Sequence, residues 1–145
     1  MKTKFALIAS AVAMAWSINT PAQAPSDNIR QEHKAAKEKC RDLQDNGRKI
    51  CEAEADGQQK VSEAQAKVQE RDTPRNRLEL AEAKAEAQYD VAKAKCGDQV
   101  GDAKDACEKQ AKAARDSAMA QAKLESQKQG SASTGASGQP AGKPQ

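Results

Sequence analysis

"KCRDLQDNGRKICE", from Lys39 to Glu52, returns in similar form as "KCGDQVGDAKDACE", from Lys95 to Glu108. In both stretches two cysteines enclose ten residues that include Asp and Gly, and the second cysteine precedes a Glu. Because Asp, Asn and Gly favour chain reversals, each stretch predicts a corner between two helices, with one cysteine on either arm.

The residues outside these corners predict an all-α fold. Ala, Lys, Glu and Gln are strong helix formers and dominate the chain, whereas β-branched and aromatic residues are sparse. Turn, N-cap and C-terminal glycine signals fall at three places: Asp45-Asn46-Gly47, Asp72-Thr73-Pro74 and Gly101-Asp102. We therefore predict four helices, at about residues 27–44, 48–71, 74–99 and 103–127.

An internal repeat relates the two corners. A shift of 56 residues superimposes "AKEKC" on "AKAKC", and "AQAK" at 64–67 on the same letters at 120–123. The repeated unit is helix, cysteine, turn, cysteine, helix, over about 31–67 and 87–123. The two units join near 73–74 inside one helical domain, 25–129, as either a compact four-helix arrangement or two hairpins set end to end.

The apolar residues predict seams of alanine between these helices. Stripes at helical spacing are Leu78, Ala81, Ala85, Ala92 and Cys96; Leu80, Ala83, Ala87, Val91 and Ala94; Val61, Ala64 and Val68; and Cys107, Ala111, Ala114, Ala118 and Ala122. Small side chains let helices approach closely, so we expect coiled-coil-like contacts in hairpins in place of a thick core.

The start of the chain has the pattern of a signal peptide. Lys2 and Lys4 precede an apolar run at 5–16, and small residues end at Ala22-Gln23-Ala24. The run is about a dozen residues, short of the roughly 20 that cross a bilayer, and no cysteine sits at the cleavage junction to carry a lipid anchor. We expect a signal peptide at 1–24, cleaved after Ala24 or Ala22. The mature chain would be periplasmic or secreted, without a transmembrane segment or lipid anchor.

The end of the chain has a different composition. Residues 130–145 read "GSASTGASGQPAGKPQ". Runs of Gly, Ser and Pro are typical of flexible linkers, so the sequence predicts a flexible tail over these residues.

Four cysteines in an exported chain favour disulfides over free thiols. Cys40 with Cys51 and Cys96 with Cys107 would clip each corner locally. Cys40 with Cys107 and Cys51 with Cys96 would join continuous helices, since eleven residues are about three helical turns. A crossed pairing is the third possibility. Continuous helices would have to absorb the corner glycines at about 1 kcal/mol each, so we favour the local pairing and leave the others open.

The second corner also carries a family resemblance. The resemblance is carried by "KCGDQVGDAKDACEKQAKAA" at 95–114, together with the "VAKAKC" that leads into it. This corner resembles a family of exported Ala/Lys-rich helical proteins of beta-proteobacteria with paired cysteines, often labelled cell envelope biogenesis protein TolA. The resemblance covers about residues 35–123 and implies a helical, disulfide-bearing architecture in the periplasm, with no activity attached. The first corner departs from the pattern because Gly47 follows the turn asparagine, Asn46.

Charge argues against a nucleic-acid partner. The chain has 24 Lys and Arg and 21 Asp and Glu. Loss of Lys2 and Lys4 with the signal peptide would leave 22 minus 21, a net charge of +1. The two signs are interspersed, and Tyr89 is the only aromatic residue after the signal. Nucleic-acid binding needs clustered positive charge or stacking side chains, so we expect no such partner.

The sequence offers little for catalysis. His33 is the only histidine and lies in a polar stretch, where we expect a surface residue. No carboxylate has an apolar setting that would shift its pKa toward acid or base chemistry. The cysteines do not form C-x-x-C motifs, and there is no glycine-rich phosphate loop or two-histidine zinc pattern. We therefore predict no enzyme, no cofactor and no metal site.

Three functional hypotheses remain. The leading one is a non-enzymatic exported protein with a structural or protein-interaction role in the cell envelope, acting on a protein partner or by self-association. The second is a periplasmic chaperone or stress protein that binds unfolded clients. The third is a small thiol/disulfide redox protein, which accessible and readily cycled cysteines would distinguish from the other two.

Overall fold

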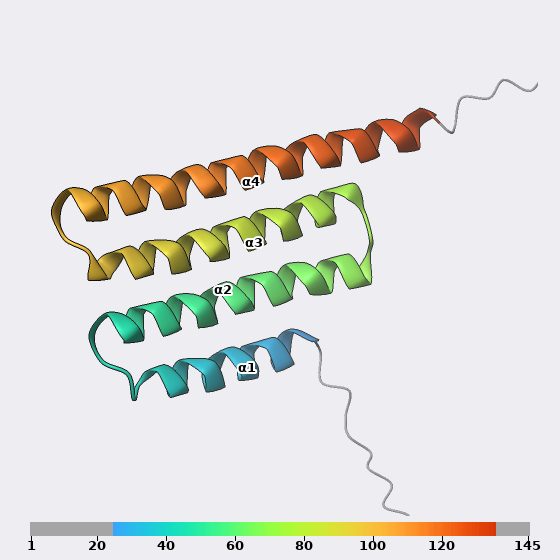
Figure 1. Cartoon of the computed structure of the whole chain (residues 1–145). Helices are drawn as coiled ribbons and strands as arrows, with labels where there is room; N and C mark the ends of the chain where they lie inside the picture. The colour runs from blue at the N-terminus through green and yellow to red at the C-terminus, as the bar shows by residue number, and fades with distance from the viewer. Residues whose placement is uncertain (1–24, 136–145) are drawn as a thin grey trace, which may run out of the picture.

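The structure is a computed structural model that describes residues 25–135 (Figure 1). The predicted signal peptide and residues 136–145 lie outside the described part. Four helices follow one another: α1 (Pro25–Cys40), α2 (Asp45–Glu70), α3 (Pro74–Lys95) and α4 (Gly101–Gly135), with a short 3-10 turn at Cys96–Asp98. The prediction of an all-α fold with about four helices is confirmed.

The helices form an open row. Figure 1 shows them side by side in chain order, each antiparallel to the one before. α1 packs on α2, α2 on α3 and α3 on α4, whereas α1 and α4 do not pack together. A closed four-helix bundle would bring the first and last helices into contact. The described chain is therefore a single layer of helices with two broad sides and two outer edges.

Burial in this layer is confined to the seams between neighbouring helices. The buried apolar side chains among the described residues are all alanine or cysteine: Cys40, Ala55, Ala64, Ala85, Cys96, Ala111 and Ala122. A helix inside a single layer has a neighbour on two sides and solvent on the other two, so large apolar side chains stay at least partly exposed. The predicted alanine seams are present, and a thick core is absent from residues 25–131.

The two stripes predicted on α3 serve different neighbours. Ala87, from one stripe, lies against Gly57 of α2, and the carbonyl of Ala94 in the same stripe accepts a hydrogen bond from Asn46 of α2. Cys96, from the other stripe, is bonded to Cys107 at the start of α4. α3 therefore has one small-residue seam on each side, which is how it occupies an interior place in the row.

One residue of the predicted seams lies elsewhere. Ala114 is exposed on α4, whereas Ala111 and Ala122 are buried. Ala114 lies at the margin of the stripe formed by Cys107, Ala111, Ala118 and Ala122, outside the narrow contact that a single neighbour provides. The prediction that Ala114 belongs to the seam is wrong.

The corner between α2 and α3 has the predicted chemistry. α2 ends at Glu70, and Thr73 is the N-cap of α3 with Pro74 as the first helical residue. The Thr73 hydroxyl accepts a hydrogen bond from the Asn76 backbone N–H at 3.1 Å, which satisfies one of the free donors of the first turn.

The other two corners lie a few residues earlier than predicted. α1 ends at Cys40, and Asp45-Asn46-Gly47 opens α2 instead of forming the turn. α3 ends at Lys95 and Gly101 is the first residue of α4. In both corners the residue that opens the second helix has a positive φ, 49° at Asp45 and 58° at Gly101. A left-handed residue at that point completes the reversal, so the turn itself falls before it.

The last helix is longer than predicted. α4 continues to Gly135, past the expected end at residue 127, so the first residues of the predicted tail are helical. Gly and Ser disfavour a helix by only about 1 kcal/mol or less per residue, and no proline interrupts this segment. None of the helices in residues 25–135 has an apolar run suited to crossing a membrane.

Candidate functional site

The disulfides lie at the two corners that the repeated sequence forms. Cys40 is bonded to Cys51 and Cys96 to Cys107, with Cα–Cα distances of 5.5 and 5.7 Å. This is the local pairing that the glycine argument favours. Each bridge joins the last turn of one helix to the first turns of the next, so it fixes the angle between the arms of a hairpin.

Both bridges lie at the same end of the row, on the left in Figure 1. Asn46 links the two corners: its Nδ2 donates to the carbonyl of Ala94 at 2.8 Å. Gly97 leaves room for this side chain, because a Cβ at Gly97 would stand 2.6 Å from Asn46 Oδ1. The two clipped corners therefore form one connected unit, which we call the disulfide end.

The two cysteines of each bridge differ in exposure. Cys40 and Cys96 are 0% exposed, while Cys51 and Cys107 are partly exposed. Thiol–disulfide exchange needs an attacking thiolate to reach a sulfur in line with the bond. Buried Cys40 and Cys96 restrict that approach, which is the environment of a structural bridge more than of a cycling one.

An ion-pair cluster joins α1 to α2. His33 Nε2 lies 2.7 Å from Asp56 Oδ1, and Lys37 Nζ lies 3.1 Å from Asp56 Oδ2. Burial raises the pKa of Asp56, but hydrogen bonds from His33 and Lys37, with their charge, outweigh burial and hold this pKa below its ordinary value. His33 was expected to be a surface residue; its side chain is 25% exposed, and α2 brings a carboxylate to it.

Further ion pairs cross the other seams on the same side of the row. Lys60 pairs with Asp90 at 3.1 Å, Lys67 with Glu79, and Arg115 Nη1 lies 3.8 Å from Glu86. Adjacent grooves between the helices share Lys60 and Glu63 and include Asp56, Lys67, Glu79, Glu86 and Asp90. We call this side the charged face.

Tyr89 is part of the contact between α3 and α4. The guanidinium carbon of Arg115 lies 4.4 Å from the centre of the Tyr89 ring, a cation–π distance. The only aromatic side chain of the described residues is therefore used in a helix seam, where a cation covers its ring.

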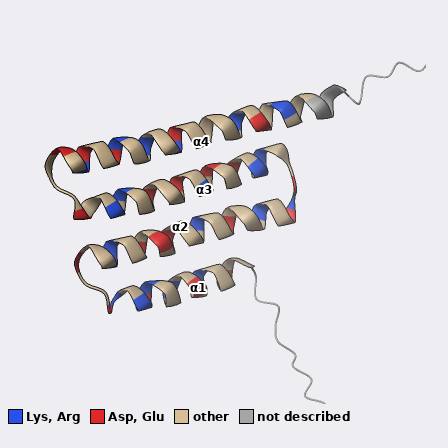
Figure 2. Ribbon diagram, viewed as in Figure 1, with Lys and Arg blue, Asp and Glu red and all other residues tan. Residues whose placement is uncertain are grey.

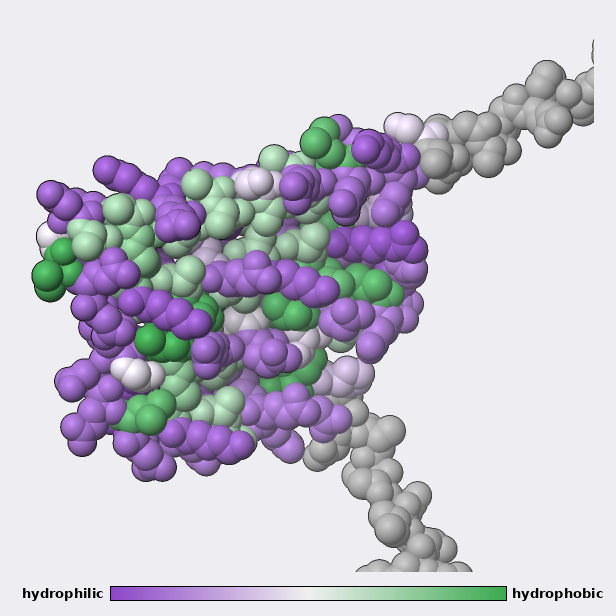
Figure 3. All heavy atoms as spheres, in the orientation of Figure 1, coloured by the Kyte–Doolittle hydropathy of each residue, from purple (hydrophilic) through white to green (hydrophobic). Residues whose placement is uncertain are grey.

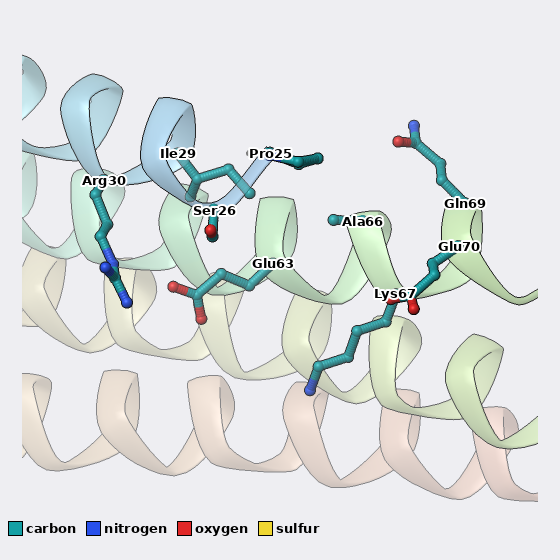
Figure 4. A pocket seen from close by; sticks show the side chains of 9 residues that line it. All are labelled: Pro25, Ser26, Ile29, Arg30, Glu63, Ala66, Lys67, Gln69 and Glu70. Atoms are coloured by element: carbon teal, nitrogen blue, oxygen red, sulfur yellow. The ribbon is translucent and has the colours of Figure 1, made fainter. Parts of the chain in front are cut away.

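A further groove on the charged face lies between the start of α1 and the second half of α2 (Figure 4). It is an open groove of about 820 Å³ lined by Ile29, Arg30, Glu63, Ala66 and Lys67, with others. Figure 4 shows Arg30 of α1 and charged side chains of both signs from α2 around the groove, with the apolar Ile29 on its α1 side. A mixed lining of this kind does not single out one class of small ligand.

The opposite side has an apolar groove between α2 and α3. Its lining includes Gly57, Val61, Ala87 and Val91. Its border is polar and consists of Glu54, Lys95 and two glutamines. Val61 and Glu63 are two residues apart on α2 and so point to opposite sides of the helix. Figure 3 shows apolar side chains as separate islands among polar ones on the side it views, so no broad apolar patch covers that side.

Charge is mixed along the whole row. Figure 2 shows Lys and Arg alternating with Asp and Glu on all four helices. Among residues 25–135, no three or more His, Cys, Asp or Glu side chains are grouped so that they could hold a metal ion.

Three residues at these contacts were not anticipated from the sequence. Gly57 permits the close approach of α2 to α3, Asn46 ties the corners together and Asp56 anchors α1. The signal for Gly57 was present, since it stands seven residues before Ala64 and therefore on the same helix face. Asn46 and Asp56 depend on which helices are neighbours, which no local pattern encodes.

Comparison of the chain with protein families, with curated proteins and with solved structures found no match. The geometry described above is therefore the basis for a functional proposal.

Proposed function

We propose that this protein is a non-enzymatic exported protein with a structural or protein-interaction role in the cell envelope. The observation that carries the proposal is the open row, because its sides and edges remain available to other molecules while the disulfide end holds the hairpins in place. Two structural bridges suit an oxidising compartment, in agreement with the expected signal peptide and with the resemblance to periplasmic helical proteins.

A chaperone role is the second candidate, and the apolar groove between α2 and α3 favours it. Val61 and Val91 are only partly buried there, so an extended apolar segment of an unfolded client could lie along them. The polar residues at the rim would keep the protein in solution when no client is bound. A redox role has weaker support, because Cys40 and Cys96 are fully buried.

Site-specific photo-crosslinking of oxidised protein in a Gram-negative periplasm separates the two roles. A photoreactive residue at Glu54 or Gln88 samples the rim of the apolar groove, and one at Lys34 on α1 is the comparison. A specific interaction role predicts one or a few discrete adducts from particular positions. A chaperone role predicts many adducts of different mass from the groove positions.

An aggregation assay completes the test. Reduced insulin, whose B chain aggregates, supplies an unrelated client, and light scattering records its aggregation. The leading proposal predicts no protection at equimolar protein. Strong protection together with a smear of groove adducts would overturn it in favour of the chaperone role. Thiol titration of native protein addresses the redox role, which requires thiols that appear and disappear with mild reductant and oxidant.

A further inference from the structure

α4 ends the row, and its outer edge has no neighbour in the described structure (Figure 1). We define this edge by six exposed residues: Ala106, Gln110, Ala113, Ser117, Ala120 and Leu124. Ala111 and Ala122, which are buried in the seam with α3, stand two residues from Ala113 and Ala120 and therefore point the other way. The six residues recur at the alternating spacing of four and three that characterises a helix-pairing seam.

A row of charges flanks this edge at intervals of seven residues. Asp102, Lys109, Asp116 and Lys123 are all exposed and alternate in sign. Asp116 also pairs within its own helix, with Lys112 at 3.1 Å and with Arg115 at 3.0 Å. The other three make no ion pair or side-chain hydrogen bond among the described residues, so their charges are free to pair with another molecule.

The order of these charges is complementary to itself in an antiparallel pair. In antiparallel helix pairs the same flank of each helix meets across the two-fold axis. We place the two-fold axis at the midpoint between Lys109 and Asp116. Each Asp102 then faces Lys123 of the other copy, and each Lys109 faces Asp116 of the other copy. Two copies therefore gain four attractive pairs.

Other arrangements lose this match. A slip by one heptad would place Lys109 against Lys109 and Asp102 against Asp116, both of like charge. In a parallel pair, the charged flank of one helix would meet the other flank of its partner helix, and Lys123 would face Lys128. The charge pattern therefore favours this orientation, and it makes more attractive pairs in this register than in any other, which is the role of flanking charges in helix pairs.

The exposed apolar residues agree with the same register. Leu124 is 58% exposed and Val100 is 84% exposed, and they are two of the three exposed large apolar residues of the described chain. Residues that face each other across an antiparallel pair have residue numbers with a constant sum. The sum for Leu124 and Val100 is nearly the same as that for Lys123 and Asp102, so the register brings Leu124 of one copy to the level of Val100 of the other. The register would thus set these two exposed apolar side chains at the same level along the pair.

We propose that a second copy of this chain docks antiparallel on the outer edge of α4, so that two rows join into one continuous layer. The proposal rests on the proposed interaction role and names the partner of this surface. α3 lies on the other side of α4 in each copy, so the two rows extend away from the junction without obstruction. Gln110 and Ser117 in the seam are polar, which favours a unique register at some cost in affinity.

Zero-length carbodiimide coupling of mixed ¹⁵N-labelled and unlabelled oxidised protein tests the register. The expected products are peptides that join Lys123 to Asp102, and Lys109 to Asp116, with one labelled and one unlabelled member. Links within one copy, such as Lys112 to Asp116, carry a single label and serve as the internal control. Mixed-label links through other residues, or none at all, would overturn the proposal.

Sedimentation velocity over a range of concentrations tests the energetics. Wild type is expected to form a dimer, and Lys123→Glu to raise its dissociation constant about tenfold, because two exposed attractive pairs become repulsive. The double variant Asp102→Lys/Lys123→Glu should regain most of the affinity. Leu124→Ser should weaken the dimer without a change in charge. Lys34→Glu on α1 is the matched control and should leave the dimer unchanged.

Each outcome of these measurements is decisive. A monomer at every concentration, or equal effects of Lys123→Glu and Lys34→Glu, would overturn the antiparallel dimer. If the chain stays monomeric but gives discrete photo-adducts, the dimer fails and the interaction role stands. If the edge pairs as expected while the groove protects insulin and gives a smear of adducts, the chaperone role replaces the leading one and the dimer stands. Circular dichroism melting shows that each variant is folded.

Discussion

Gly57 of α2 lies directly against Ala87 of α3, where a Cβ added to Gly57 would stand 2.8 Å from the Cβ of Ala87. This contact sets how closely the two central helices of the row approach. Since the row has no core to absorb a displacement, a wider seam at this point would weaken the burial of Ala64 in the same seam.

Gly57→Ala is therefore expected to destabilise the protein by about 1 to 3 kcal/mol, the usual cost of overpacking, despite the better helix propensity of alanine. Urea unfolding followed by circular dichroism measures the change. Gly47→Ala is the matched control on the same helix, because a Cβ there meets nothing within 4 Å. It should stabilise the protein by about 0.5 to 1 kcal/mol. Equal effects at the two positions would contradict the close approach.

The positive φ angles at the corners predict that glycine is favoured at both of two equivalent positions. Asp45 has a φ of 49°, which glycine adopts at lower cost, so Asp45→Gly should stabilise the first corner by up to about 1 kcal/mol. Gly101→Ala should destabilise the second by about 1 to 2 kcal/mol, since its φ is 58°. Thermal melts of the oxidised proteins measure both. Destabilisation by Asp45→Gly would show that the Asp45 side chain has a further role.

The two bridges are expected to contribute stability independently. In the chain-entropy model a bridge across a loop of this length contributes roughly 2 to 3 kcal/mol. Cys40→Ala/Cys51→Ala and Cys96→Ala/Cys107→Ala should each lower the free energy of unfolding by that amount, with little loss of helix content at low temperature. Urea unfolding of both double variants, with fully reduced wild type as the comparison, measures this. Midpoints unchanged from oxidised wild type would contradict a stabilising role for the bridges.

Local features of the sequence predicted much of this structure because they act within a few residues. The Thr73 N-cap and Pro74 correctly predicted the start of α3, and each of the two small-residue stripes on α3 packs against a neighbouring helix. The corner at Asp45 was misplaced because Asp, Asn and Gly support either a turn or the first turn of a helix. The left-handed φ of Asp45 decides between them, and it is set by the corner as a whole.

The arrangement of the helices could not be predicted in the same way. Ala85 and Ala87 lie on stripes that would suit a closed bundle as well as an open row, since both need small residues at helix contacts. The cluster around Asp56 depends on α1 lying beside α2. The outer edge of α4 is exposed because α1 does not pack against α4. These features follow from non-local packing, which alanine specifies weakly.

Acid should weaken the attachment of α1 to α2 before it unfolds the rest of the row. The pKa of Asp56 is lowered in the folded protein, so its contribution is present above the unfolded value of about 4 and is lost as the pH falls through the folded value. Because the Asp56 side chain is 47% exposed, solvent screening keeps this contribution below about 1 kcal/mol. Hydrogen exchange of α1 amides between about pH 5 and pH 2.5 should show a loss of protection that Asp56→Asn reduces, whereas Lys34→Gln on the exposed side of α1 leaves it unchanged. A loss of protection that is identical in wild type and Asp56→Asn would exclude Asp56 as the anchor of α1.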